Sequence, residues 1–525
     1  MITRDVSGAT GEEYDLIVIG GGIYGASLAL EATRRGLRPL LLERADFGGA
    51  TTWSSLRIVH GGLRYLQSLD LRRFRTSVAE RRWFCRTYPD LVETLECVMP
   101  LFGSGLKRPS VFRAALFVND LLSKGRNAGV REDRVLPPGR LLDPTDVRAR
   151  IPLVRTRGLR GGALWYDVIM KSSVRVLVES LRWACRSGAT ALNYVEALSL
   201  GQHAGRVVGV HAVDRVSGQQ HFYRSARIVN CAGPWCREVA GAFDRDVPEL
   251  FNPSLAFNLL FDRPALGPHA LAVEPPARGA PTYFVVPWNG RMLAGTHHLS
   301  WTERPETITP PEAEIDAFID ALNRALPGLG VSRGEVRRSY AGQLPAAALN
   351  SRDAARTPIL YDHRARGGPQ GLVSVSGVKW TTARDVAERT LALMYGSVPT
   401  LPTDDVGPRL FEPERLSDMQ WAEHRHEDLL PLFRRVAEEE SVVWLDDLLL
   451  RRVEGLDTDA AVLAAVRAGL DVMRAHGGHE EEHLRRLLCE LDTRLDKAAA
   501  TLRSAFKLEA RGIQDVDRDR QNPHA

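Results

Sequence analysis

The chain has 525 residues, of which 44% are hydrophobic, and a formal net charge of +4 at pH 7. This length predicts about two to four domains, the mild charge argues against a nucleic-acid-binding protein, and no apolar run reaches the roughly 20 residues that span a bilayer. The six cysteines are scattered without a Cys-x-x-Cys pair, which argues against a metal site and a disulfide framework. The N-terminus lacks a signal-peptide pattern, so we expect a cytoplasmic protein.

A dinucleotide-binding unit is predicted near the start of the chain. The apolar run Leu16–Ile19 predicts a buried strand, and the glycines Gly20, Gly22 and Gly25 follow it at G-x-G-x-x-G spacing. This spacing allows a tight turn, close approach of a pyrophosphate and close packing of the next helix. A second apolar strand ends on Glu43, whose carboxylate suits an adenosine ribose and would repel a 2′-phosphate. The bound dinucleotide could therefore be FAD or NAD, and NADP is disfavoured.

Further along, residues 71–160 indicate helices and loops, and residues 165–240 indicate a second α/β stretch. Residues 250–350 carry strand signals, and a second strand–glycine–helix unit follows near 372–395. Apolar spacing typical of helices marks the last part of the chain. We expect a disordered lead, a linker, a helical domain and a disordered tail, at 1–13, 401–416, 417–510 and 511–525.

Five motifs are spread in order along nearly the whole chain. They are I-V-H-G-G-L-R-Y-L at Ile58–Leu66, N-C-A-G-P-W at Asn230–Trp235, V-P-W at Val286–Trp288 with Gly295-Thr296, S-G-V-K-W-T-T-A-R at Ser376–Arg384, and the segment Val442–Asp447 with Arg451-Arg452. Together they resemble the FAD-dependent glycerol-3-phosphate dehydrogenases.

The resemblance implies an oxidoreductase region over 14–400 with two domains. One is an α/β FAD-binding Rossmann-like domain, built from about 14–70, 165–240 and 355–395. The intervening segments would form an α+β substrate domain with a mixed or antiparallel sheet. The C-terminal domain would be all-helical.

The resemblance also implies FAD as the cofactor and places residues around it. Gly20, Gly22 and Gly25 would hold FAD with Glu43 on the ribose, Thr52, Ser54 and Ser55 near the pyrophosphate, Gly233 and Trp235 on the adenine side, and Lys379 and Thr381 at the isoalloxazine end. A cation at Lys379 would stabilise the anionic reduced flavin. The alternative interpretation is that Lys379 is an ordinary surface lysine in a turn, without a role at the flavin.

The implied chemistry is hydride transfer from a hydroxyl-bearing carbon to flavin N5, with quinone or oxygen as the electron acceptor. His60 is the first candidate for the base because its ordinary pKa lies near neutral pH; it could also be a hydrogen-bonded histidine in a buried turn. Arg64 and Tyr65 would orient the substrate. The pair His297 and His298 is the alternative base.

The sequence departs from the family pattern at the substrate site. Leu344 replaces an arginine, His298 replaces an acid, and Lys171-Ser172 replaces an acidic pair. Losing one charge-assisted contact to a phosphate would cost about 1.5–3 kcal/mol. The residues that could substitute are Arg57, Arg64, Arg337, Arg338, Lys379 and His298. The substrate could therefore be a phosphorylated polyol or another hydroxy acid, alcohol or amine, and a flavin-binding protein without this activity is the third reading.

A membrane contact is predicted for residues 101–126. Phe112, Leu116, Phe117 and Leu121 share helical spacing and are flanked by basic residues. An apolar stripe with cations suits a helix at a bilayer surface, and the family docks on the membrane at this point. The alternative is an ordinary helix packed on the core. A membrane contact would place the protein peripherally on the inner face of the cytoplasmic membrane.

Overall fold

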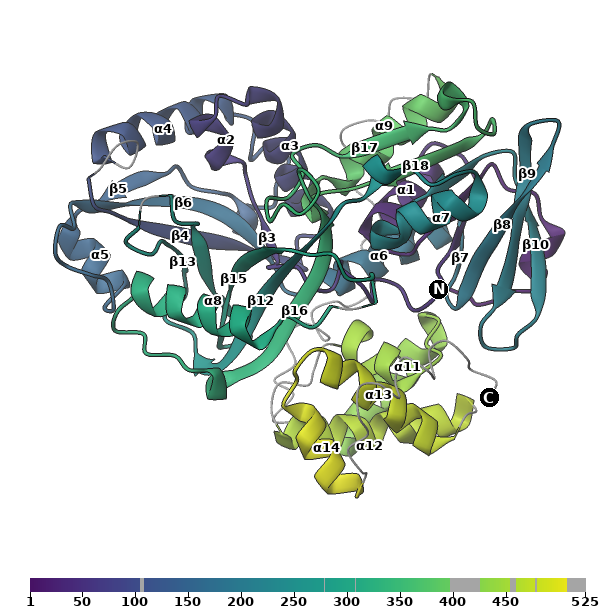
Figure 1. Cartoon of the computed structure of the whole chain (residues 1–525). Helices are drawn as coiled ribbons and strands as arrows, with labels where there is room; N and C mark the ends of the chain where they lie inside the picture. Colours follow the sequence, from purple (N-terminus) through teal and green to yellow (C-terminus); the bar gives the residue numbers. More distant parts are fainter. Residues whose placement is uncertain are drawn as a thin grey trace.

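The computed structural model has two large sheets and a group of C-terminal helices (Figure 1). It describes residues 1–103, 108–277, 279–306, 308–396, 425–453, 459–476 and 479–507. The predicted linker 401–416 and tail 511–525 lie outside these ranges, as do parts of the predicted helical domain 417–510. No helix within the described ranges has both the length and the apolar character of a membrane span.

The first sheet has six strands in the order β17-β18-β11-β1-β2-β7. The strands are β1 (Leu16–Ile19), β2 (Pro39–Leu42), β7 (Thr190–Leu192), β11 (Ile228–Asn230), β17 (Ile359–Asp362) and β18 (Leu372–Ser376). All but the edge strand β17 run parallel. Every residue of β1 and β2 is buried, as expected for a parallel sheet covered on both faces.

Alternate residues of β1 enter different cores. Leu16 and Val18 pack in one cluster with the helices α1 (Ile23–Thr33), α6 (Ser173–Arg186) and α9 (Ala383–Tyr395). Ile17 and Ile19 pack on the other face, against β8 (Val195–His203), β9 (Arg206–Asp214) and β10 (Gln220–Arg224), which form a three-stranded sheet. Helix α7 (Cys236–Phe243) lies beside this second face and adds Phe243 to the same cluster.

The N-terminal residues correct one prediction. Residues 1–13 were expected to be a disordered lead, but Ile2, Val6 and Ala9 are buried. Val6 and Ala9 belong to the core on the second face of the six-stranded sheet, and the Ile2 N–H donates to the carbonyl of Glu439 at 2.8 Å. Apolar residues spaced among polar ones therefore cover a sheet face that would otherwise meet water.

The second sheet has nine strands in the order β16-β12-β15-β14-β13-β4-β6-β3, with β5 beside β6. They are β3 (Ile58–Val59), β4 (Val92–Leu101), β5 (Arg140–Leu142), β6 (Gly161–Met170), β12 (Pro253–Pro264), β13 (Ala270–Val273), β14 (Tyr283–Trp288), β15 (Arg291–Ser300) and β16 (Val336–Pro345). The sheet is mixed, because β13 pairs with β4 in parallel and its other pairings are antiparallel in the register of the described strands. Its helices are α2 (Leu63–Gln67), α3 (Leu71–Thr87), α4 (Pro109–Leu122), α5 (Pro144–Arg150) and α8 (Glu312–Ala325).

The C-terminal helices lie below both sheets in Figure 1 and share their own apolar core. They are α11 (His426–Glu439), the π-helical turn η10 (Asp447–Arg452), α12 (Asp459–His476), α13 (Glu480–Thr493) and α14 (Ala498–Phe506). A parallel dinucleotide-type sheet, a mixed sheet and a helical C-terminal region together confirm the predicted fold class.

Buried ion pairs join the C-terminal helices to the six-stranded sheet. Asp46, four residues after β2, accepts hydrogen bonds from Arg451 at 2.7 Å and from both terminal nitrogens of Arg452 at 2.8 Å. Burial alone would raise the pKa of Asp46, but Arg452 and Arg451 outweigh it and hold that pKa at about 2. Glu440 likewise accepts from Arg175 of α6 at 2.8 Å.

We expect Arg452→Met to destabilise the protein strongly. It removes two hydrogen bonds from the fully buried Asp46 carboxylate, and breaking a buried ion pair costs about 3–5 kcal/mol. Arg474→Met is the matched control, because Arg474 forms exposed ion pairs with Asp471 and Glu480, which contribute less than about 1 kcal/mol. Melting temperatures should fall clearly for the first variant and little for the second; equal melting temperatures would contradict the argument.

Candidate functional site

A cavity of about 1490 Å³ lies where the two sheets and the C-terminal helices meet. It exceeds the roughly 300–1,000 Å³ of pockets for drug-sized ligands, so it can hold an extended molecule. Its lining includes Gly20, Gly22, Glu43, Thr52, Ser54, Ser55, Gly233 and Trp235 of the predicted cofactor set, His298 and Leu344 of the nine-stranded sheet, and Arg451 and Arg494 of the C-terminal helices.

The glycine turn after β1 has the geometry that its motif requires. Gly20 has φ +106°, and a Cβ there would lie 2.6 Å from the carbonyl oxygen of Cys231. A Cβ on Gly25 would lie 1.9 Å from the Gly20 carbonyl oxygen, so α1 could not pack as closely. At Gly22 the nearest atom is Thr52 Oγ1, at 3.3 Å, and the residue lines the cavity. Gly20 and Gly25 are therefore needed for the turn and for close packing of the backbone, whereas Gly22 leaves room in the cavity for a ligand.

Glu43 closes this part of the cavity at the end of β2. Its carboxylate accepts the N–H of Gly21 at 2.6 Å and the N–H of Ala45 at 2.8 Å. Burial raises the pKa of Glu43, and these two hydrogen bonds oppose that rise. Each oxygen keeps a lone pair that can accept a hydroxyl, as a ribose contact requires.

The segment after Glu43 carries hydroxyl groups that need partners. Thr52 Oγ1 accepts the N–H of Ile23 at the start of α1, at 3.1 Å. Ser54 Oγ and Ser55 Oγ are buried and have no hydrogen-bond partner within the described part of the chain. Buried polar atoms are normally satisfied, so these hydroxyls fit a ligand with polar oxygens, as FAD has along its pyrophosphate.

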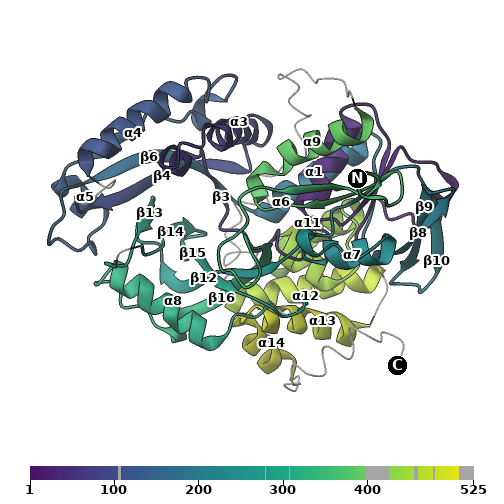
Figure 2. The ribbon, with the colours of Figure 1, turned by 45° about the horizontal axis from the view of Figure 1, so that its top comes forward.

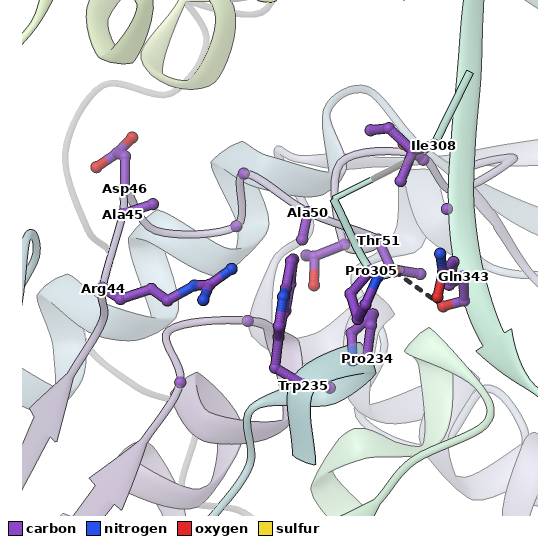
Figure 3. A pocket seen from close by; sticks show the side chains of 18 of the residues that line it. Arg44, Ala45, Asp46, Ala50, Thr51, Pro234, Trp235, Pro305, Ile308 and Gln343 are labelled. Carbon is purple, nitrogen blue, oxygen red and sulfur yellow. Dashed lines mark hydrogen bonds between the residues drawn. The ribbon is translucent and has the colours of Figure 1, made fainter. Parts of the chain in front are cut away.

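Trp235 and Arg44 stand together on one side of the cavity (Figure 3). The Arg44 guanidinium lies 4.3 Å from the centre of the Trp235 ring, and Trp235 Nε1 donates to Glu306 at 2.6 Å. The neighbouring Gly233 has φ +58°. Gln343 Nε2 donates to the carbonyl of Arg304 at 2.8 Å, which holds the loop containing Glu306 against β16.

Lys379 lies between Val378 and Trp380, which line the cavity, and its backbone is held by Tyr24. The Tyr24 hydroxyl donates to the Lys379 carbonyl at 2.7 Å and accepts the Lys379 N–H at 2.9 Å. The ammonium lies 4.1 Å from the centre of the Tyr65 ring. Burial, and next the charge of Arg64, lower the pKa of Lys379 to about 8.

Tyr24 was not among the predicted site residues, because it occupies a variable position of the glycine motif. The nearby turn η8 (Trp380–Thr382) contains Thr381 of the predicted set.

His60 is held by an aspartate that the sequence analysis did not single out. His60 Nδ1 lies 3.3 Å from Asp167 Oδ2, and the His60 side chain is 48% exposed. Asp167 is buried and also accepts from the Gly61 N–H at 2.7 Å, Arg81 at 2.7 Å and Trp165 Nε1 at 3.0 Å. Burial would raise the pKa of Asp167, but His60 and Arg81 bring it well below its ordinary value. The sequence did contain a signal for Asp167, since it is the one acidic residue within the otherwise apolar strand β6.

The two adjacent histidines of β15 face opposite sides, as their strand positions predict. His297 Nε2 lies 3.0 Å from Glu314, away from the cavity. His298 lines the cavity, and its Nδ1 is buried without a partner in the described structure. Burial, and next His297, lower the pKa of His298 to about 4, so His298 is neutral at pH 7. No cluster of metal-ligand side chains occurs within the described ranges.

Two predicted substrate contacts require correction. Arg57 is 1% exposed, and its guanidinium lies 4.1 Å from the Trp288 ring centre and 4.5 Å from that of Tyr340. Arg338 is also 1% exposed and forms an ion pair with Asp496 beyond α13. Neither lines the cavity; His60, Arg64, Tyr65, Lys379 and Thr381 do not line it either, but Arg57 and Arg338 are in addition almost fully buried. Both cations were predicted from residue type alone, and packing places them in the interior.

With this geometry in view, comparison with known proteins defines the class. Residues 15–388 match the family of FAD dependent oxidoreductases, so the chain belongs to that family. The cofactor is FAD, and the chain is an FAD-dependent dehydrogenase of the glycerol-3-phosphate dehydrogenase-like type. These findings confirm the predicted family resemblance and cofactor.

Several individual proteins that are similar to this chain are named glycerol-3-phosphate dehydrogenases. The chain is 32% identical over 408 residues to a glycerol-3-phosphate dehydrogenase of Synechocystis sp., which covers 74% of this chain and 72% of the relative. It is 32% identical over 397 residues to glycerol-3-phosphate dehydrogenase 1 of Mycobacterium bovis, which covers 73% of each. The fold is similar to the glycerol-3-phosphate dehydrogenase from Bacillus halodurans complexed with FAD, with a TM-score of 0.69, 20% identity and coverage of 94% of this chain and 97% of that one.

We expect Gly22→Val to weaken FAD binding without loss of the fold. The new side chain would enter the cavity, where its nearest protein neighbour is Thr52. Overpacking of about 1–3 kcal/mol corresponds to a loss of about 5- to 140-fold in affinity. Gly241→Val in α7 is the control, since only Asp246 N, at 4.0 Å, lies near a Cβ there. The flavin-to-protein absorbance ratio measures the outcome, and a full FAD complement in Gly22→Val would show that the cofactor does not pass this residue.

Proposed function

We propose that the enzyme oxidises the secondary hydroxyl of glycerol 3-phosphate or a closely similar phosphorylated polyol. The observation that supports this is the pair of cations Arg64 and Lys379. Neither has a carboxylate partner within the described residues, and the charge of Arg64 lowers the pKa of Lys379. Neighbouring cations without counter-charge favour the binding of an anion, which a phosphate supplies.

The side chains around this pair have roles that suit alcohol oxidation. Bound FAD would accept a hydride at flavin N5. His60 would take the hydroxyl proton, because Asp167 orients its ring through Nδ1 and leaves Nε2 for the substrate. Tyr65 would position the Lys379 ammonium by a cation–π contact. His298, neutral at pH 7 and facing the cavity, is the second candidate for the base.

The departures from the family pattern concern affinity more than chemistry. Leu344 lines the cavity where the family has an arginine, so β16 gives no charge to a phosphate at this position. Arg64 and Lys379 would then hold the anion without a charge from β16, and we expect weaker binding of glycerol 3-phosphate than in relatives that keep the arginine. The apolar Leu344 and the neutral His298 also suit a different hydroxy acid, alcohol or amine, which is the alternative substrate class. Electrons would pass to quinone or oxygen.

Anaerobic reduction by substrate tests the proposal directly. The holoenzyme should lose its flavin absorbance near 450 nm on mixing with glycerol 3-phosphate, and glycerol at equal concentration should act far more slowly because it lacks the anion. Bleaching by a hydroxy acid or an amine, but not by glycerol 3-phosphate, would assign the alternative substrate class. Failure of the whole panel to bleach the flavin would contradict a dehydrogenase of small alcohols or amines.

The pH dependence of this reduction should report Lys379. Its pKa is lowered to about 8, so the cation is present below that pH and is lost as the pH rises through it. The reduction rate should therefore fall above about pH 8. Lys379→Met should remove this step and slow reduction about 100-fold at pH 7, as losing one transition-state charge contact does. Lys497→Met is the control, because Lys497 pairs with Asp262 away from the cavity. An unchanged pH profile in Lys379→Met would exclude the residue from the site.

We also propose that α4 makes a peripheral membrane contact, through a face that differs in part from the predicted stripe. Phe112 and Leu116 are buried and cannot meet a bilayer, whereas Phe117 is 69% exposed and Leu121 is 60% exposed. In Figures 1 and 2, α4 lies on the outer side of its sheet, remote from the C-terminal helices. Exposed apolar side chains on an outer helix suit shallow insertion.

Vesicles of anionic lipid should therefore co-sediment the protein at low salt and release it at high salt. The double variant Phe117→Ser/Leu121→Ser should bind less, because it removes the exposed apolar face. Leu198→Ser, an exposed leucine on β8, should bind like the unmodified chain. Equal sedimentation of all three, or none at low salt, would contradict an interfacial role for α4.

A further inference from the structure

Arg494, the residue that follows α13, reaches the predicted FAD-binding segment from the C-terminal helices. Its side chain is 3% exposed, and its guanidinium carbon lies 3.7 Å from the centre of the Trp53 ring. Nη2 donates to the Gly49 carbonyl at 3.0 Å and to Glu490 at 3.1 Å. Nε and Nη1 have no hydrogen-bond partner in the described structure, so stacking on Trp53 is a principal contact of this cation.

Trp53 presents its ring to the back of the segment whose front lines the cavity. Thr52 and Ser54 line the cavity on either side of it, whereas Trp53 is absent from the lining and is 1% exposed. Its ring packs edge-on against Tyr340 of β16, with ring centres 5.1 Å apart. Arg494, which also lines the cavity, and Tyr340 of β16 therefore both contact the Trp53 ring, so the position of this ring sets where Thr52 and Ser54 stand.

Other elements already hold parts of the segment's backbone, because Asn258 Nδ2 donates to the Ser54 carbonyl at 2.9 Å and Ser173 Oγ to the Thr52 carbonyl at 3.3 Å. Thr52 Oγ1 bonds the start of α1, but the hydroxyls of Ser54 and Ser55 lack partners in the described chain. A segment that must offer these groups to a ligand needs support from elsewhere, because preorganised contacts bind more tightly than mobile ones. Part of this support comes from Arg494, which lies outside residues 15–388, the part that matches the family.

We propose that Arg494 is a positioning residue of the FAD site: by stacking on Trp53 and bonding Gly49, it holds segment 49–55 in the conformation that binds the cofactor. The C-terminal helices are then part of the cofactor site and not only an added domain. This inference rests on the proposed placement of FAD against Thr52, Ser54 and Ser55, and does not depend on the identity of the substrate.

Release of FAD from the full-length holoenzyme tests the proposal. After dilution, the gain in flavin fluorescence gives the release rate, with no substrate present. Arg494→Met should speed release about tenfold, the factor that a desolvated cation–π contact and its hydrogen bond represent. Arg494→Lys keeps the charge but loses the planar guanidinium that stacks on Trp53. Its release rate should therefore lie between those of the unmodified chain and Arg494→Met. Arg474→Met, in an exposed ion pair of the same helices, should release FAD at the unmodified rate.

Trp53→Phe separates a positioning role from general destabilisation. It keeps an aromatic ring but weakens the stack, so it should also speed release, and the double variant Arg494→Met/Trp53→Phe should release FAD no faster than Arg494→Met. If the two single effects add fully, or if release follows only the melting temperature across all variants including Arg452→Met, Arg494 is structural and the proposal is overturned. Unchanged release in both Arg494→Met and Trp53→Phe would overturn it as well.

Discussion

The buried pairing of Asp46 with Arg451 and Arg452 is the interaction on which the rest of this structure depends. A carboxylate removed from water is stable only when cations and hydrogen bonds replace its hydration, and here both arginines come from the C-terminal helices. Asp46 lies between Glu43 and segment 49–55. The same pairing that docks the helices therefore fixes the chain that builds one wall of the cavity.

The site divides its functions between the two sheets. The parallel strands supply backbone N–H groups and Glu43 at their carboxyl ends, where dinucleotides bind in open α/β sheets. The mixed sheet presents alternate residues of β15, so His298 faces the cavity while His297 faces Glu314. In the proposed function, the substrate end would combine the neutral His298, the half-exposed His60 held by Asp167, and the cations Arg64 and Lys379, a set that suits oxidation of an alcohol carrying an anion.

Another group of polar residues shows why accessibility matters as much as arrangement. His363 Nδ1 lies 2.8 Å from Asp244 and Nε2 lies 2.9 Å from Ser374 Oγ, the order of a nucleophilic triad. Both His363 and Ser374 are completely buried, and Ser374 Oγ also accepts from Asn230 at 3.1 Å. A serine without access to a substrate cannot act as a nucleophile. These hydrogen bonds are therefore structural and tie β11, β18 and the end of β17 together.

The sequence by itself determined the dinucleotide unit, the FAD family and the loss of the family arginine at Leu344, because each depends on residue types at short, fixed spacing. Only the tertiary structure decided the partners of these residues. The contacts of Asp167 with His60, of Tyr24 with Lys379 and of Arg494 with Trp53 join segments far apart in the chain, and no local pattern records such pairings. For the same reason residue type alone makes Arg57 and Arg338 candidates for the substrate although packing buries them, and a polar pattern alone predicts disorder for residues 1–13 although they cover a sheet face.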